Sequence, residues 1–366
     1  MNEITYILGA GASYYSFPVV KTFADRMNYF FKVIDGQSTM HHKEVANELH
    51  AFISEIRVHQ SFDTYFKKLF HLGKDNDILR AKKVLNYYFL LEQLEFPSTA
   101  PIYFKYSDIN GNDIDYPLNE NSFNKKDLVD SRYDALIAGL LKPIKGEAKF
   151  FTKINFITWN YDLNLLASIK NFLAPDRKIN EFISDCTINE NENIWKIADD
   201  LQIINMNGYF FSDFFKDLKN FNTEDIIAIR NLLHEMKYFF ALEKNILTED
   251  AKKIKFGWED IHSKNSLIEN AVSSIKNSKS VVIIGYTFPS YNRYLDAKYF
   301  TGTTLAGKEV FIQDPNADEI VSFLNSEFDI EQPFTSKSIN KKFLPKISAK
   351  KNCDSFYIPN NIISKI

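Results

Sequence analysis

Cysteine is scarce in this chain: only Cys186 and Cys353 occur among its 366 residues, and they lie far apart in the sequence. Two distant cysteines exclude a disulfide framework, and they cannot supply the four thiolates of a structural zinc module. So few cysteines are typical of proteins in a reducing compartment. We therefore expect a cytoplasmic protein that needs no metal.

Long hydrophobic runs and a strong net charge are absent as well. No segment approaches the roughly 20 consecutive apolar residues of a membrane-spanning helix, and no basic stretch followed by a long apolar one opens the sequence. The net charge is -3, whereas a protein built mainly to bind nucleic acid needs a basic face to neutralise phosphates. We expect no membrane segment, no leader peptide and no direct nucleic-acid binding.

What the sequence does contain is an alternation of strand and helix patterns. Short apolar runs bounded by turn residues are typical of buried parallel strands, and segments with helical spacing of apolar residues lie between them. This alternation predicts an α/β fold with a Rossmann-like, doubly wound parallel sheet. The expected strands are 4–9, 154–159, 201–206, 280–286 and 309–314, and the clearest expected helices are 19–34, 162–173, 224–244 and 266–277.

One long segment interrupts the alternation. Residues 41–95 have helical apolar spacing throughout, and residues 101–123 are polar and rich in turn residues. Within the latter, Asn110-Gly111 is typical of a β-hairpin turn. The expected division is a Rossmann-like core at 1–34 and 131–327, a mainly helical insertion at 35–130, and a C-terminal extension at 328–366 in which no element is predicted.

The segment ILGAGAS, residues 7–13, places Gly9 and Gly11 directly after the first expected strand and ahead of a helix. Glycines at such a turn allow the backbone to approach a pyrophosphate, whose charge then lies at a helix N-terminus. A Rossmann fingerprint has a third glycine at position 14, where this chain has Tyr14. The alternative is a tight turn that uses glycine for its conformation alone.

Three further turns follow expected strands. Asn160 and Asp162 in FITWNYD come just after a strand, where an amide and a carboxylate can hold ribose hydroxyls or orient a water molecule. Helix capping is the alternative there, and for this motif taken alone it is favoured. Gly285 in VVIIGYTFP and Asp314 in FIQDPN stand at the ends of two later strands, and each also fits a plain turn.

Taken together and in this order, the four segments resemble the sirtuin-like family, in particular its bacterial branch in anti-phage defence. SFDTYFKKLF (61–70) and DSRYDALIAGLL (130–141) extend the resemblance, which spans most of the first 320 residues. The resemblance implies a Rossmann-like lobe that binds NAD, with a helical lobe inserted into it. In that family the first turn is Gly-Ala-Gly-Ala-Ser and binds NAD without the third glycine.

The resemblance also assigns roles to individual residues. Asn160 and Asp162 match the Asn-Tyr-Asp segment beside the nicotinamide ribose, and the two later turns match those near the adenosine half. The residues assigned in this way to NAD are Gly9, Ala10, Gly11, Ala12, Ser13, Asn160, Asp162, Gly285, Tyr286 and Asp314.

The chain departs from the family at the catalytic histidine. In IINMNGYF, Asn207 occupies the position of that histidine before Gly208. An imidazole titrates near neutral pH and can accept a proton, whereas an amide offers only hydrogen bonds, and loss of a general base costs about 10²–10⁴-fold in rate. Asn160, Asp162 and Asn207 are therefore the candidate catalytic residues, and His234 is a candidate substitute base.

The resemblance implies an NAD+ hydrolase that cleaves the nicotinamide–ribose bond to nicotinamide and ADP-ribose. Such an enzyme acts in antiviral defence by abortive infection, depleting NAD with a partner subunit encoded nearby, in a homo-oligomer or a hetero-complex. The presence of Asn207 favours an alternative, a catalytically inactive NAD- or ADP-ribose-binding subunit that senses or scaffolds. An unrelated α/β nucleotide-binding enzyme is the second alternative.

The cysteine count generates a first prediction. Protein-deacylating sirtuins contain a four-cysteine zinc module, which this chain cannot form. The purified protein should therefore release no acetyl groups from acetylated lysine peptides in the presence of NAD, measured by mass spectrometry of the peptide. Deacetylation above the level of a protein-free control would contradict this expectation.

Overall fold

The structure is a computed structural model that divides into two compact units. Unit 1 comprises Met1–Ala12, Ser131–Tyr209 and Lys255–Ile366, and unit 2 comprises Ser13–Asp130 and Phe210–Ile254. The residues that the structure describes are 3–35, 40–59, 61–94, 106–107, 113–114, 129–177, 179–188, 191–210, 251–259, 266–327 and 344–360.

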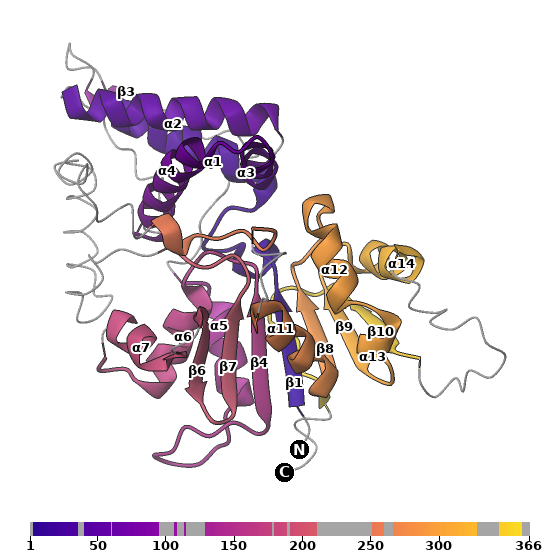
Figure 1. The fold of residues 1–366 in the computed structure, drawn as a ribbon. Helices are drawn as coiled ribbons and strands as arrows, with labels where there is room; N and C mark the ends of the chain where they lie inside the picture. Colours follow the sequence, from indigo (N-terminus) through magenta and orange to yellow (C-terminus); the bar gives the residue numbers. More distant parts are fainter. Residues whose placement is uncertain are drawn as a thin grey trace. The chain divides into compact units, whose positions relative to one another are not determined.

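Unit 1 is built on an eight-stranded sheet with the order β10-β9-β8-β1-β4-β7-β6-β5 (Figure 1). The six strands from β10 to β7 are parallel to one another, whereas β6 is antiparallel to β7 and to β5, which forms one edge. The prediction of a Rossmann-like α/β fold is confirmed. The strands are β1 (Glu3–Leu8), β4 (Lys153–Thr158), β5 (Thr187–Ile188), β6 (Asn191–Ala198), β7 (Leu201–Asn205), β8 (Ser278–Ile284), β9 (Glu309–Gln313) and β10 (Lys346–Lys350).

The central strands read as continuous apolar runs because side chains pack on both faces of the sheet. Ile7 of β1 stands in register with Ile157 of β4 and Ile283 of β8, and all three belong to one buried cluster together with Ala271 and Ile275. The alternate residues face the other way, where the rings of Tyr6 and Phe156 stack with centroids 5.3 Å apart.

Helices cover this sheet between the strands. The segment Ser266–Asn277 forms α11, which matches the expected helix 266–277 and packs against β1, β7 and β8 (Figure 1). The expected helix 224–244 lies outside the described residues. None of the described helices is both long and apolar enough to cross a bilayer. The other helices of unit 1 are α5 (Ser131–Leu140), α6 (Asn164–Leu173), α7 (Ile179–Cys186), the 3-10 helix η4 (Ser290–Asn292), α12 (Arg293–Tyr299), α13 (Gly302–Leu305) and α14 (Ala317–Glu327).

The C-terminal segment is part of unit 1 and not a separate extension beyond residue 327. Its strand β10 pairs in parallel with β9. The Gln313 side-chain amide donates to the carbonyl oxygens of Asn352 and Ser355, both at 2.6 Å, and its oxygen accepts from the Tyr357 N–H at 2.9 Å. The sequence KISAK gave no strand prediction because this edge strand is half-buried and lacks an apolar run.

Unit 2 is mainly helical, and its first helix belongs to it and not to the Rossmann-like core. Phe23 of α1 packs on Phe62 and Tyr88, with ring centroids 4.7 and 4.9 Å apart. These aromatic contacts move the boundary from the expected residue 35 to Ser13. The helices are α1 (Val20–Asp35), α2 (Met40–Val58), α3 (Phe62–His71) and α4 (Asp75–Leu94), followed by strands β2 (Tyr106–Ser107) and β3 (Asp113–Ile114).

Local sequence accounts for two features of unit 2. Strands β2 and β3 pair antiparallel on either side of Asn110-Gly111, as the hairpin motif predicts. At the start of α3, the Ser61 hydroxyl accepts a hydrogen bond from the Thr64 N–H at 3.1 Å, which satisfies one of the free donors at a helix N-terminus.

Candidate functional site

The strand order reverses between β1 and β8. From β1 the chain adds β4 and β7 on one side, and then returns through α11 to add β8 and β9 on the other side of β1. In open α/β sheets, ligands bind outside the carboxyl ends of the strands at such a reversal. The turns that follow β1 and β8 carry Gly9, Gly11 and Gly285, so the predicted glycine motifs lie at this position.

The two glycine turns are packed directly against each other. The Gly9 N–H donates to the Ile284 carbonyl oxygen at 2.9 Å, and the Gly11 N–H donates to the Gly285 carbonyl oxygen at 3.0 Å. A Cβ atom on Gly9 would lie 2.4 Å from the Gly285 oxygen. Gly285 has φ +60°, and a Cβ there would lie 2.4 Å from the Ala12 nitrogen. Backbone contact between the turns therefore requires glycine at these positions.

The contact between the turns changes the interpretation of the glycines. Because the N–H groups of Gly9 and Gly11 donate within the fold, they are not the groups that would bind a phosphate. After Gly9 the chain forms a 3-10 helix, η1 (Ala10–Ser13), and α1 begins only at Val20. The helix expected at residues 19–34 is confirmed as α1, but the glycine turn leads into η1 and not directly into α1. Pro18 explains the interruption, since a proline disfavours helical backbone at the residue before it.

The remaining residues of the first turn differ in exposure. Ala10 is exposed, whereas Ala12 is buried and its N–H donates to the Gly9 carbonyl oxygen at 2.9 Å. Ser13 is buried and belongs to unit 2, where its carbonyl oxygen accepts from the N–H groups of Ser16 and Phe17. Of the predicted turn residues, Ala10 is thus the one that presents its side chain to solvent.

Asn160 and Asp162 follow β4 at the same edge of the sheet. The Asn160 N–H donates to the Thr158 hydroxyl at 3.1 Å, and its side chain is buried. One carboxylate oxygen of Asp162 accepts from the Asn164 N–H at 3.0 Å and from the Asn164 side-chain amide at 2.6 Å. Asp162 therefore forms an Asx turn at the start of α6, which is the capping role that the sequence left open.

Asn207 joins the end of β7 to the end of β4. Its side-chain amide donates to the Trp159 carbonyl oxygen at 2.9 Å, and its side-chain oxygen accepts from the Gly257 N–H at 3.2 Å. The Asn207 carbonyl oxygen also accepts from the Lys255 N–H at 2.9 Å. The residue is only 7% exposed. Asn207 thus lies beside Trp159, the neighbour of Asn160 in sequence, with both ends of its amide bonded to backbone.

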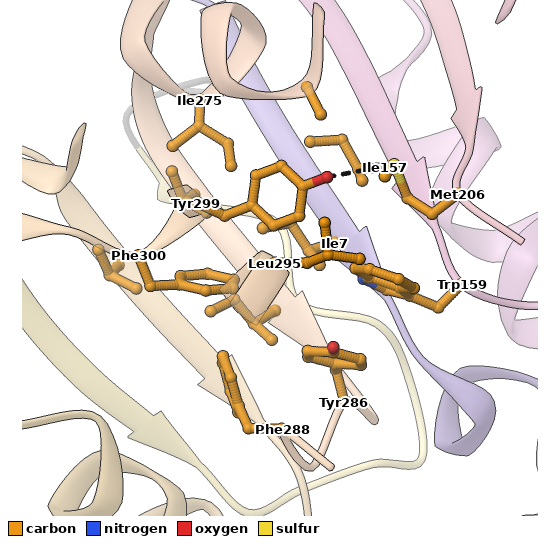
Figure 2. Close-up of a cluster of buried hydrophobic side chains, with 14 of the residues drawn as sticks. Ile7, Ile157, Trp159, Met206, Ile275, Tyr286, Phe288, Leu295, Tyr299 and Phe300 are labelled. Atoms are coloured by element: carbon orange, nitrogen blue, oxygen red, sulfur yellow. Dashed lines mark hydrogen bonds between the residues drawn. The ribbon is translucent and has the colours of Figure 1, made fainter. Parts of the chain in front are cut away.

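Tyr286 and Asp314 complete the predicted set. The Tyr286 ring stacks on that of Trp159, with centroids 5.5 Å apart and planes 10° apart, inside the buried cluster that Figure 2 shows. A nucleotide contact at Tyr286 would therefore involve its backbone. One Asp314 carboxylate oxygen accepts from the Asn316 N–H at 2.9 Å. The pKa of Asp314 is raised, because burial raises it more than this hydrogen bond lowers it.

Sequence reasoning missed Arg132, which supports the first glycine turn. Its buried guanidinium donates to the carbonyl oxygens of Ala12 and Cys353, both at 3.0 Å, and lies 4.8 Å from the centre of the Phe356 ring. Arg132 thereby joins the turn after β1 to the C-terminal segment. Local spacing could not reveal this role because both acceptors are backbone atoms, each more than 100 residues away.

Unit 1 therefore brings the turns with Gly9, Gly11 and Gly285 together, and it bonds the Asn207 side chain to Trp159, the residue before Asn160. His234, the candidate substitute base, lies outside the described residues. Within the parts of the chain that the structure describes, no three His, Cys, Asp or Glu side chains gather as a metal site would require.

No protein-family model matches the chain, and no curated protein matches it. The resemblance to the sirtuin-like family therefore rests on the ordered sequence motifs.

The contact between the turns generates a prediction about stability. Gly285→Ala places a methyl group against the backbone of Gly11 and Ala12 at a positive φ, so we expect a loss of about 2–5 kcal/mol in the free energy of unfolding. Gly307→Ala is the matched control, since Gly307 has φ +69° and no atom within 4 Å of the added Cβ. It should lose only about 1–2 kcal/mol.

Denaturant unfolding of the two variants and the wild-type chain measures this difference. Equal losses for the two variants would show that the turns do not depend on close contact at Gly285.

Proposed function

We propose that the chain binds NAD or ADP-ribose at the carboxyl edge of the sheet, where the turns after β1 and β8 meet. The observation that supports this most is the pair of interlocked glycine turns at the strand-order reversal, the position at which open α/β sheets bind nucleotides. The sirtuin-like motifs add support, because their turn residues fall on these same two turns.

The composition of the turns suits a ligand that is recognised through backbone groups. The exposed residues are Ala10 in the first turn and Thr287 in the second, and neither carries a bulky or charged side chain. A pyrophosphate at these turns would lie beside Ala10 and Thr287. Neither turn carries a negatively charged side chain that would repel an anionic ligand.

The reaction that we propose is hydrolysis of the nicotinamide–ribose bond. Water adds to the ribose carbon, the bonding electron pair leaves with nicotinamide, and a proton is released to solvent. Asn160 is the residue that would position the water or the ribose. The support for this reaction is the resemblance to the defence branch of the sirtuin-like family, and the same resemblance supports the role in antiviral defence with a partner subunit.

A second candidate is a binding subunit without catalysis. The specific observation that favours it is Asn207, which stands at the family's histidine position and has both ends of its amide engaged with backbone groups. An amide held in this way fixes the ends of β4 and β7 and accepts no proton. Nucleotide binding is common to both candidates.

Binding is tested by a change of charge at Ala10. Ala10→Glu adds a carboxylate where the phosphates would lie, and we expect at least about tenfold weaker binding of ADP-ribose, because like charges repel strongly at short range. Ala10→Gln is the neutral control and should bind like the wild-type chain. Isothermal titration calorimetry measures both. Absence of binding to the wild-type chain, or equal binding by both variants, would contradict the proposed site.

Release of nicotinamide from NAD distinguishes the two candidates. For a hydrolase, Asn160→Ala should lower the rate about 100-fold or more, while Asn277→Ala, a matched change at an exposed helix end, should leave it unchanged. A binding subunit should bind ADP-ribose and release no nicotinamide. Turnover that survives Asn160→Ala would refute the role of this residue.

A further inference from the structure

A buried hydrogen-bonded cluster lies behind the turn that follows β8. Asp296 of α12 has no exposed surface, and one of its carboxyl oxygens accepts from the Tyr286 hydroxyl at 2.8 Å. The same hydroxyl accepts from the Asn292 side-chain amide at 3.2 Å. The other oxygen of Asp296, Oδ2, has no hydrogen-bond partner in the described part of the chain. An ionised carboxylate in this position would leave a buried oxygen without a donor, so the neutral form is favoured.

Tyr286 connects this cluster to the first glycine turn. A Cβ atom on Gly9 would lie 2.6 Å from the Tyr286 Cα and 2.8 Å from its Cβ, so the backbone at Tyr286 touches the turn after β1. The Tyr286 ring also stacks on Trp159, which carries the carbonyl oxygen that Asn207 binds (Figure 2). A displacement of the Tyr286 side chain would therefore disturb both the turn after β1 and the turn after β4 that contains Trp159.

The turn after β8 is held in an unusual backbone conformation. Gly285 has φ +60° and Phe288 has φ +54°, and Phe288 is the one described residue other than glycine with a positive φ. A bulky residue adopts this conformation only where its surroundings impose it. Phe288 is buried against Tyr286 and Phe300, with ring centroids 4.9 and 4.8 Å apart. Packing around Tyr286 thus helps to hold the strained turn.

We propose that Asp296 is a positioning residue whose neutral carboxyl group holds Tyr286, and through it the turn after β8, against the glycine turn after β1. When Asp296 ionises, its buried Oδ2 atom carries negative charge and needs a hydrogen-bond donor. The short helix α12 then shifts to admit water, and the two turns loosen. The expected loss of nucleotide affinity rests on the proposed function, whereas the expected loosening of the two turns does not.

The electrostatics of the cluster agree with this geometry. Burial raises the pKa of Asp296 to about 7, and the hydrogen bond from Tyr286 and the positive charge of Arg293 oppose part of the rise. The Tyr299 hydroxyl also interacts with Asp296, and burial keeps this hydroxyl neutral by raising its pKa. Because the folded state favours the protonated acid, its stabilising contribution is complete below the unfolded pKa of 3.8 and is lost as the pH rises towards 7.

The fluorescence of Trp159 in the full chain tests the proposal without any nucleotide, because Trp159 stacks on Tyr286. Between about pH 5.5 and about pH 8.5 we expect a sigmoidal change centred near pH 7, which Trp159→Phe abolishes. Asp296→Asn should abolish it too, whereas Glu319→Gln, the same charge change at an exposed site, should retain it. Tyr286→Phe should shift the midpoint to higher pH, because it removes the hydrogen bond that lowers the pKa of Asp296.

Calorimetric titration with ADP-ribose tests whether ionisation of Asp296 weakens nucleotide binding. Affinity of the wild-type chain should fall about tenfold across this pH interval, and that of Asp296→Asn should stay constant. A fluorescence profile identical in wild type and Asp296→Asn overturns the proposal. If the Trp159 fluorescence changes with pH but the affinity for ADP-ribose does not, the proposed effect of Asp296 on nucleotide binding is overturned. No binding at any pH refutes the proposed function, while the fluorescence still decides the role of Asp296.

Discussion

The close approach of two backbone turns is the constraint on which the candidate site depends. Gly285 lies against Gly11 and Ala12 with no room for a Cβ atom, and hydrogen bonds from Gly9 and Gly11 extend the pairing of β1 with β8 beyond the strand ends. A strand-order reversal normally leaves a crevice between the flanking connections. In this protein the two turns are in direct contact, so a ligand bound at the reversal would not lie between them.

The surrounding groups hold these turns from three directions. Asn207 fixes the end of β7 to the end of β4 through the Trp159 carbonyl oxygen. Trp159 supports Tyr286 by stacking, and Arg132 bonds the Ala12 carbonyl oxygen. Asn207 and Arg132 use the polar atoms of their side chains on backbone partners, as structural residues do. These hydrogen bonds give Asn207 a structural role at the position that the resemblance assigns to a base.

The sequence predicted those parts of the fold that local pattern determines. Apolar runs located the five expected strands of the parallel sheet to within two residues at every end, and Asn110-Gly111 located a hairpin. Patterns could not identify β10, a half-buried edge strand, or the partners of Arg132. The sequence revealed the glycines but not the contact between them, because Gly11 and Gly285 are more than 270 residues apart in the chain. Long-range backbone contacts leave no local periodicity.

A crystal structure of the full chain grown with ADP-ribose would show whether the interlocked turns bind a nucleotide. Pyrophosphate density should then lie at the carboxyl ends of β1 and β8, beside Ala10 and Thr287, with the contact between Gly11 and Gly285 intact. Pyrophosphate bound elsewhere on the chain, or turns that separate to admit it, would refute a nucleotide site on these turns.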